Sequence, residues 1–283
     1  MTVLEAIQKS TDYLAKKGVD SPRLQSELLL AHVLKTQRLK LYLDFARGLS
    51  DQETAALRDL VQRRGNREPL QHILGTAVFC GLEMKVNKSV LVPRPETEVL
   101  AEHAWKFLNS LGRDSTFLDF GTGSGCIAIA VCHHAKQARG WAIDRSPEAL
   151  AVAAENASAT RVNDRLTLLE SDGFKAFDPS MRFDLIVSNP PYIPSQEIES
   201  LQEEVRDYDP RAALDGGADG LDFYRLLGSE SAHFLTDRGK MMLEFGDGQE
   251  AVLPAIFSST GWQVESVERD FTLRPRILIL RRS

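Results

Sequence analysis

The segment 183–194, FDLIVSNPPYIP, begins as a buried strand and then places two prolines side by side. Proline fixes φ and removes a backbone donor, so a central strand ends where Pro190 and Pro191 stand. The side-chain oxygen of Asn189 can accept one hydrogen bond, and the carbonyl of Pro190 can accept another because the prolines keep it out of any ladder. Two such acceptors suit a planar –NH2 group, beside which the Tyr192 ring can form an apolar wall. The two prolines stiffen the arrangement, which favours a preorganised site.

A glycine-rich loop is the second feature that could do chemistry. GTGSG (121–125) follows an expected strand and opens an expected helix. Glycines let the backbone turn tightly and approach a ligand, and the start of a helix offers free N–H groups. The spacing is G-x-G-x-G, with Cys126 where the dinucleotide fingerprint has its third glycine, and this counts against a nicotinamide cofactor. The phosphate-loop pattern is absent as well.

Acidic residues stand at the ends of the next two expected strands. Asp144 can accept hydrogen bonds from both ribose hydroxyls of an adenosine-bearing cofactor, or it can cap the helix that begins at Pro147. The strand after it ends in SDGF (171–174), where Asp172 could accept from an adenine amino group and Phe174 could flank the ring. Ligands of open α/β sheets bind at the carboxyl ends of the strands. We therefore expect these groups to meet in one cofactor crevice.

The elements that must position these residues alternate between strand and helix from Ser115 onward. This alternation predicts a mostly parallel sheet with helices on both faces. The strands are expected at 115–120, 140–144, 166–172, 183–189, 240–245, 262–268 and 276–282. The helices are expected at 121–135 after the glycine loop, and at 146–158, 220–235 and 248–259.

The first part of the chain has helical periodicity instead. Apolar spacing predicts helices over 3–18, 23–35 and 51–65. Ser21 with Pro22 is expected to open the second of these helices, and Ser50 to cap the third. Short alternating segments around Gly81 then predict a β-hairpin. The predicted division is a helical substrate-recognition domain over 1–73, a hairpin linker over 74–92 and a catalytic domain over 93–283.

Composition limits the class of protein. Of 283 residues, 43% are hydrophobic and 26% are charged, which is typical of a soluble globular protein. No apolar run approaches the roughly 20 residues that span a bilayer, and the first residues lack a signal peptide's apolar core, so we expect no membrane partner and a cytoplasmic location. The three cysteines, Cys80, Cys126 and Cys132, form no C-x-x-C pair, which predicts reduced core thiols and no metal site.

Charge is divided unevenly along the chain. Residues 1–90 carry 14 Lys+Arg against 10 Asp+Glu, and the remainder carries 20 against 30. An acidic body is a poor match for DNA, whose binding depends on cationic contacts with phosphate. The segment 195–209 is itself acidic, and we expect it to flank a substrate entrance unless it is only a solvated helix.

These motifs together resemble S-adenosylmethionine-dependent methyltransferases that act on planar exocyclic or amide nitrogens. NPPY alone is shared by adenine-N6 DNA methyltransferases and protein glutamine-N5 methyltransferases. The wider chain is similar to the bacterial release factor glutamine methyltransferases, the HemK/PrmC family. The segments that carry this similarity are PLQHILG (69–75), LVPRPETE (91–98), NPPYIP (189–194) and DYDPRAALDGGADGLDFY (207–224), together with the small N-terminal helical domain.

The resemblance implies a seven-strand sheet whose last strands form an antiparallel hairpin. It also implies methyl transfer from S-adenosylmethionine to the side-chain amide N5 of the glutamine in the Gly-Gly-Gln motif of class I peptide chain release factors. The cofactor residues would be Gly121, Thr122, Gly123, Ser124, Gly125 and Asp144, with Asp172 and Gly173 near adenine. Asn189, Pro190, Pro191 and Tyr192 would hold the glutamine. Of these, Asn189, Pro190 and Tyr192 would be the catalytic residues, and Asn189 would also contact the cofactor. A bulky aromatic often stands where this chain has Gly173, so Phe174 is expected to supply the stacking.

Other functions are left open by the sequence. A glutamine in a ribosomal protein is an alternative substrate within the same class. An adenine-N6 DNA methyltransferase is disfavoured by the acidic body, because base flipping needs a cationic groove. A nucleotide-sensing module without turnover is disfavoured by the intact NPPY motif. We expect the chain to act as a monomer without a DNA partner.

Overall fold

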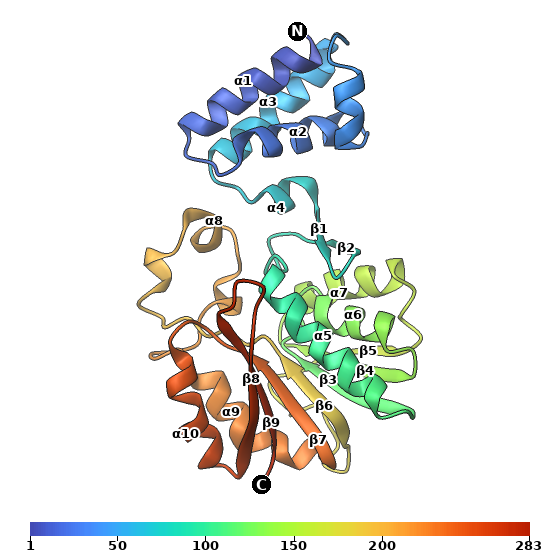
Figure 1. Cartoon of the computed structure of the whole chain (residues 1–283), viewed down its shortest axis with the longest axis vertical. Helices are drawn as coiled ribbons and strands as arrows, with labels where there is room; N and C mark the ends of the chain where they lie inside the picture. The colour runs from blue at the N-terminus through green and yellow to red at the C-terminus, as the bar shows by residue number, and fades with distance from the viewer. The chain divides into compact units, whose positions relative to one another are not determined.

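The structure, a computed structural model, describes all 283 residues and separates into two compact units (Figure 1). The first unit comprises Met1–Gly75 together with Gln202–Tyr208, and the second comprises Thr76–Leu201 with Asp209–Ser283. The first unit is helical. Its elements are α1 (Val3–Lys16), α2 (Pro22–Val33), the 3-10 helix η1 (Arg38–Leu43), α3 (Asp51–Gly65), α4 (Leu70–Leu74) and α8 (Glu203–Arg206).

Side-chain caps fix the starts of two helices in this unit. Ser50 accepts a hydrogen bond from the backbone N–H of Glu53, whose own side chain accepts from the Ser50 backbone, so the predicted cap of α3 is confirmed. Thr2 caps α1 in the same way. The predicted cap at Ser21 is wrong, because Ser21 has a left-handed backbone (φ +48°) and makes no capping bond. Of the predicted pair, only Pro22 has its expected place, as the first residue of α2.

A buried carboxylate holds η1 against α2. Glu27 is 1% exposed and accepts hydrogen bonds from Arg23 (3.1 Å), Arg38 (3.1 Å) and the Tyr42 hydroxyl (2.8 Å). Burial by itself would raise the pKa of Glu27, but these hydrogen bonds outweigh it and lower the pKa. Glu27 is therefore ionised at neutral pH and anchors the segment that follows α2.

The segment Gln202–Tyr208 joins the helical unit through ion pairs. Glu204 accepts from Arg64 at 3.0 Å and from Arg67 at 2.7 Å, and the Tyr208 hydroxyl donates to the backbone oxygen of Asn66 at 2.9 Å. Arg64 is buried and also donates to Gln25 at 2.6 Å. In this part of the acidic segment 195–209, Glu204 is therefore paired with two arginines, whereas the Glu203 side chain is 58% exposed.

The second unit is built on a seven-strand sheet in the order β5-β4-β3-β6-β7-β9-β8. The first five strands of that order run parallel, and β9 pairs antiparallel with both β7 and β8, so the predicted fold class is confirmed. The strands are β3 (Ser115–Phe120), β4 (Ala138–Asp144), β5 (Leu166–Glu170), β6 (Phe183–Ser188), β7 (Leu235–Glu244), β8 (Trp262–Arg269) and β9 (Pro275–Arg282).

Helices cover both faces of this sheet (Figure 1). One face packs against α5 (Pro95–Ser110), α6 (Cys126–His134) and α7 (Pro147–Ala159), and the other against α9 (Asp222–Glu230) and α10 (Leu253–Ser258). Adjacent residues of β3 show the alternation, since Phe117 belongs to the first core and Leu118 to the second. Short 3-10 turns complete the unit at Ile198–Ser200, Arg211–Ala213, Ser231–Phe234 and Gln249–Ala251.

The predicted hairpin is present as β1 (Thr76–Phe79) and β2 (Leu82–Lys85), and it groups with the sheet unit. Asn156 on α7 ties it to the glycine loop. The buried Asn156 side chain accepts from the backbone N–H of Lys85 at 2.7 Å and donates to the backbone oxygen of Ser124 at 2.9 Å. One side chain thus connects three segments that lie far apart in the sequence.

The remaining composition-based expectations concern membranes and thiols. No helix of the chain is both long and apolar enough to cross a bilayer. All three cysteines are free, and burial raises the pKa of Cys126 and of Cys132 to about 12, so both are inert core thiols at neutral pH.

Candidate active site

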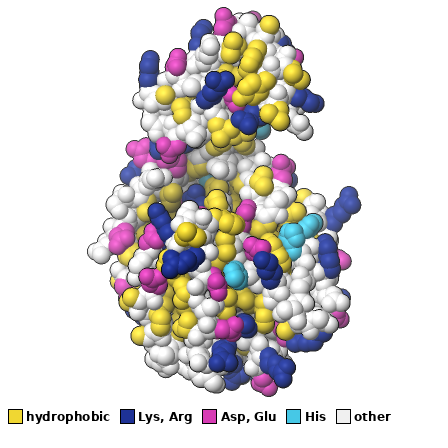
Figure 2. All heavy atoms as spheres, in the orientation of Figure 1, with side chains coloured by type: hydrophobic (Ala, Val, Ile, Leu, Met, Phe, Trp, Pro, Cys, Tyr) yellow, Lys and Arg dark blue, Asp and Glu magenta, His cyan; other side chains and the backbone are white.

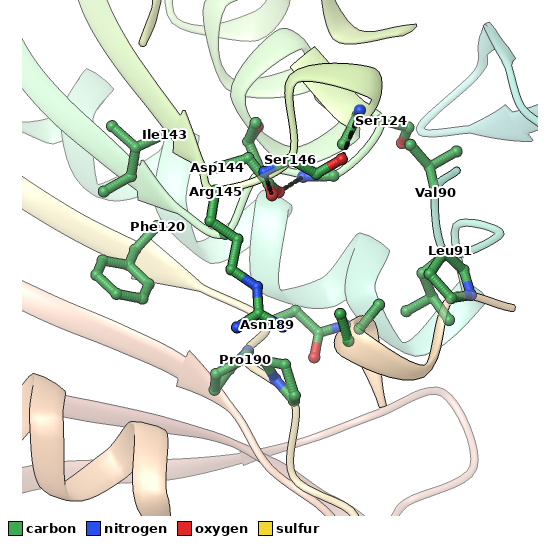
Figure 3. A pocket seen from close by; sticks show the side chains of 18 of the residues that line it. Val90, Leu91, Phe120, Ser124, Ile143, Asp144, Arg145, Ser146, Asn189 and Pro190 are labelled. Carbon is green, nitrogen blue, oxygen red and sulfur yellow. Dashed lines mark hydrogen bonds between the residues drawn. The ribbon is translucent and has the colours of Figure 1, made fainter. Parts of the chain in front are cut away.

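A pocket of about 300 Å³ lies at the carboxyl ends of β3, β4, β5 and β6, where the sequence predicted a crevice (Figure 3). Its volume is at the lower limit of ordinary small-molecule sites. The glycine loop, the end of β4, the SDG segment and the start of NPPY contribute Gly121, Thr122, Gly123, Ser124, Asp144, Asp172, Gly173, Asn189, Pro190 and Pro191 to its lining. Three further predicted site residues, Gly125, Phe174 and Tyr192, do not line it.

A buried acid that the sequence analysis did not identify makes hydrogen bonds to the glycine loop and to the start of α6. Asp119, on β3, is wholly buried and accepts hydrogen bonds from the Thr122 hydroxyl (2.7 Å) and the Ala128 backbone N–H (3.1 Å). Burial raises the pKa of Asp119 to about 7. Gly125 belongs to the same loop but serves packing. Its φ is +80°, and a Cβ there would lie 3.1 Å from that of Ala153.

Asp144 extends this support from the neighbouring strand. Its carboxylate accepts from the backbone N–H of Gly123 (2.9 Å) and of Ser146 (3.0 Å), as the dashed lines in Figure 3 show. The cap of α7 is the Ser146 hydroxyl, which accepts from Ala149 at 3.1 Å, and not Asp144 itself. Asp144 therefore joins two strand ends and presents a carboxylate at the pocket.

The SDGF segment is arranged differently from the sequence-based expectation. Phe174 is 4% exposed and stacks on Phe234, with ring centroids 4.8 Å apart, so it is a core residue and does not flank the pocket. The carboxylate of Asp172 is largely exposed and pairs with Lys175. Two other aromatic residues, Phe120 and Phe223, do line the pocket, and Phe120 lies on the same side as Ile143 in Figure 3.

Asn189 also lines the pocket and is connected to a second buried acid. Its side-chain nitrogen donates to the Thr97 hydroxyl at 3.1 Å, and that hydroxyl donates to Glu244 at 2.7 Å. Thr97 and Glu244 are each 2% exposed. Burial raises the pKa of Glu244 to about 7, although hydrogen bonds from Thr97 and Asn189 act in the opposite direction. Thr97 lies in the PRPETE segment and also lines the pocket.

The rest of NPPY is enclosed by the DGGADG segment. A Cβ on Gly216 would lie 2.8 Å from both the Pro191 oxygen and the Tyr192 Cα, and one on Gly220 would lie 2.4 Å from the Tyr192 oxygen. Gln249 donates to that same oxygen at 3.0 Å. Only glycine leaves room for so close an approach, a role that the sequence analysis did not assign to this segment.

Tyr192 is not among the residues that line the pocket. The ring packs toward Gly246, where a Cβ would lie 2.8 Å from it, and contacts the core beneath α9 and α10. Burial raises the pKa of the Tyr192 hydroxyl far above its ordinary value. The Tyr192 ring thus packs on the core beside the turn that carries Asn189 and Pro190, and its predicted place beside the substrate amide stays a prediction.

Arg94, from the same PRPETE segment, lines the pocket opening and forms an ion pair with Asp209 at 2.8 Å. The carboxylate of Asp209 is 1% exposed, whereas the Arg94 side chain is 39% exposed. The pair joins the segment before α5 to the segment that follows Tyr208.

Comparisons with known proteins agree with the motifs. Residues 5–75 match the family model described as the PrmC N-terminal domain, and residues 96–206 match the methyltransferase small domain. A solved structure of a methyltransferase from Pyrococcus furiosus superposes with a TM-score of 0.52 at 22% identity, covering 71% of this chain and 88% of that one, which supports the fold.

Curated relatives cover nearly the whole chain. The release factor glutamine methyltransferase of Geobacter sulfurreducens is 47% identical over 92% of this chain and 90% of its own length. That of Caulobacter vibrioides is 39% identical over 99% and 96%, and that of Chlorobaculum tepidum is 42% identical over 91% and 90%. Such identity across both units shows that this chain belongs to the release factor glutamine methyltransferase family.

Proposed function

We propose that this protein transfers a methyl group from S-adenosylmethionine to the side-chain amide N5 of the glutamine in the Gly-Gly-Gln motif of class I release factors. One observation carries the proposal. The Asn189 amide nitrogen is occupied by Thr97, so the amide oxygen remains as an acceptor at a pocket that also contains the glycine loop and Asp144. Family membership supports the same reaction.

The pocket residues fit an adenosine-bearing sulfonium cofactor. We assign its sugar to the carboxylate of Asp144 and its amino acid part to the loop 121–124, with Asp172 and Gly173 near the adenine. Phe120 and Ile143 offer the apolar surfaces that a flat base requires. When bound, S-adenosylmethionine supplies an electrophilic methyl group on a positively charged sulfur.

The chain's own contribution is to position a weak nucleophile. An amide nitrogen reacts poorly because its lone pair is delocalised into the carbonyl. Acceptance of its two N–H groups by the Asn189 Oδ1 and the Pro190 carbonyl oxygen fixes the nitrogen and favours positive charge on it. The lone pair would then be directed at the methyl group for in-line displacement, in which the N–C bond forms as the S–C bond breaks and S-adenosyl-L-homocysteine is the leaving group. Positioning and electrostatics supply most of the effect, and the proton leaves to water after transfer.

We further propose that the helical unit recognises the release factor. On η1, the apolar side chains of Leu39, Tyr42 and Leu43 are 71%, 41% and 85% exposed. Figure 2 shows hydrophobic side chains gathered on one face of the helical unit. Exposed apolar residues grouped in this way are typical of protein contact sites. A translation factor as substrate also agrees with the predicted cytoplasmic location, with action as a monomer and with the absence of a DNA partner.

The test is methyl transfer to parallel substrates. The purified chain is incubated with methyl-labelled S-adenosylmethionine and with a class I release factor, the same factor with its Gly-Gly-Gln glutamine replaced by alanine, total ribosomal proteins, or duplex DNA. We expect label in the intact factor alone. Label in ribosomal protein or in DNA would replace the proposed substrate with the corresponding alternative.

A matched pair of variants connects the activity to the site. Asn189→Ala should lower kcat at least about a hundredfold, as expected for the loss of a preorganised polar group. Asn163→Ala, at an exposed position of the same unit, should leave kcat unchanged. Near-normal turnover by Asn189→Ala would refute the proposed role of NPPY.

A further inference from the structure

A buried carboxylate is connected to the amide of Asn189 through a single hydroxyl. Glu244 is the last residue of β7, and Thr97 lies in the first turn of α5. The distances are 2.7 Å from the Thr97 Oγ1 to the Glu244 Oε2, and 3.1 Å from the Asn189 Nδ2 to the Thr97 Oγ1. The backbone oxygen of Glu244 is itself fixed by the buried Tyr224 hydroxyl at 2.9 Å. This series of hydrogen bonds therefore begins at a buried, hydrogen-bonded residue of the sheet.

The direction of these hydrogen bonds follows from the chemistry of the three groups. Burial raises the pKa of Glu244 to about 7, so above that pH its carboxylate is ionised and can only accept, and the one hydroxyl hydrogen of Thr97 is committed to Glu244. The lone pairs of the Thr97 oxygen can then only receive a donor. The –NH2 end of the Asn189 amide is that donor, and its oxygen must point the other way. In a buried series of hydrogen bonds, a group that can only accept fixes the donor and acceptor roles of its neighbours, and here that group is the ionised Glu244.

We propose that Glu244 and Thr97 are positioning residues that fix the orientation of the Asn189 amide and so present its oxygen to the substrate –NH2 group. This inference rests on the proposed function, and it adds two residues outside the NPPY motif to the amide-binding machinery. Glu244 acts through the Thr97 hydroxyl and through its own side-chain interaction with Asn189, and Thr97 acts through Asn189.

The orientation matters because an asparagine amide has nearly the same shape when turned over. A turned Asn189 would place its own –NH2 against the –NH2 of the glutamine, and two donors repel where an acceptor is needed. Loss of the hydrogen bonds that orient the Asn189 amide should lower kcat about tenfold to a hundredfold, the range expected when a buried hydrogen-bonding group is mismatched. Cofactor binding depends on the glycine loop and Asp144, so its affinity should change less than about twofold.

Substitutions at Thr97 separate the hydroxyl from the shape of the side chain. Thr97→Val keeps the shape and removes the hydroxyl, whereas Thr97→Ser keeps the hydroxyl. We expect Thr97→Val to lose kcat while Thr97→Ser retains at least about half of it. Glu244→Gln introduces an –NH2 group that can donate to Thr97 and reverse the direction of the hydrogen bonds, so it should also lower kcat. Glu83→Gln, at an exposed position on β2, is the matched control and should behave as wild type.

A double substitution tests whether Thr97 acts through Asn189. If it does, Thr97→Val should have no further effect in an Asn189→Ala background, measured in single turnover with enzyme in excess. A residue that merely supports the fold would lower the rate in both backgrounds. Independent, multiplicative losses in the double variant would overturn the proposal, as would a wild-type kcat in Thr97→Val.

A readout without turnover separates this inference from the proposed function. The side-chain –NH2 of Asn189 can be followed by NMR, with its signals identified by their loss in Asn189→Ala. We expect slow hydrogen exchange in wild type and in Thr97→Ser, and fast exchange in Thr97→Val and Glu244→Gln. Equal exchange in all four proteins would refute the inference even if the release factor is methylated. Slow exchange lost only in the two predicted variants would support it even if another amide proves to be the substrate.

Discussion

The backbone oxygen of Tyr192 lies 2.4 Å from the position that a Cβ on Gly220 would occupy, and Gly216 approaches Pro191 and Tyr192 almost as closely. The DGGADG segment is therefore a close-fitting support for NPPY. Its glycines are required by contact distance, which explains a run of residues that carries no ligand chemistry of its own.

This contact gives the first prediction. Gly216 has an ordinary backbone conformation, so Gly216→Ala adds only the clash with Pro191 and Tyr192. We expect a loss of about 1–3 kcal/mol in the free energy of unfolding and a lower kcat, because NPPY must shift. Urea denaturation and methyl transfer measure the two effects. Gly48→Ala, where a Cβ meets nothing within 4 Å, is the control. Equal behaviour of the two variants would show that the support is not tight.

The second prediction concerns pH and the buried Glu244. Its pKa in the folded protein is about 7, above the value of 4.5 for the unfolded chain, so the folded state binds the proton more tightly. Stability from this group is therefore greatest at low pH and is lost as pH rises from about 4.5 through 7. Wild type should gain about 2 kcal/mol between pH 8 and pH 5.5 relative to Glu244→Gln, measured by urea denaturation.

Other ionisable groups also interact with Glu244. Comparing wild type with Glu244→Gln removes the pH dependence of stability that these groups contribute to both proteins. A pH dependence of the same size in Glu244→Gln would assign the titration to another residue. The ionisable neighbours that interact with Glu244 are Glu96 on α5, Cys126 on α6, Tyr192 after β6, Tyr224 on α9 and Arg276 on β9.

A third prediction tests the ion pairs within the helical unit. Arg64 is 6% exposed and Glu204 is 17% exposed, so Glu204→Gln leaves a buried guanidinium with a weaker partner. We expect a loss of roughly 1–3 kcal/mol and faster tryptic cleavage at Arg206. The exposed pair of Glu199 with Arg211 provides the control, since Glu199→Gln should cost less than about 0.5 kcal/mol. Equal protease resistance of both variants would contradict the role of Glu204.

The fourth prediction concerns recognition by η1. Leu39→Ser with Leu43→Ser should raise KM for the release factor about tenfold or more and leave kcat at saturation unchanged, because these side chains lie outside the pocket. Phe271→Ser with Leu273→Ser removes equally exposed apolar side chains from the turn between β8 and β9 and should leave KM unchanged. A KM that rises only in the control would move the contact site to that turn.

Local signals in the sequence were sufficient for most elements and for the edge at which the pocket lies. Strand–helix alternation and the residues that end β4 and β6 locate Asp144 and Asn189 because parallel strands finish at one edge. The α3 cap at Ser50 was equally readable, since its partner Glu53 is three residues away.

Contacts between residues far apart in the sequence could not be predicted from local patterns. Thr97 and Glu244 meet only because α5 packs on the sheet beside β7, and no local pattern records that contact. Phe174 was misassigned because the sequence does not show whether an aromatic residue two positions after Asp172 points to the pocket or to the core. In the structure it stacks on Phe234 in the core. Ser21 failed as a cap because its left-handed backbone cannot aim the hydroxyl at the helix.

The most direct test of the central claim is to locate the transferred methyl group. A class I release factor is treated with the enzyme and S-adenosylmethionine, digested, and analysed by fragmentation mass spectrometry of the peptide that contains Gly-Gly-Gln. The account predicts one added methyl group on the glutamine side chain with wild type and none with Asn189→Ala. A methyl group on any other residue, or an unmodified peptide beside a methylated ribosomal protein or DNA, would contradict it.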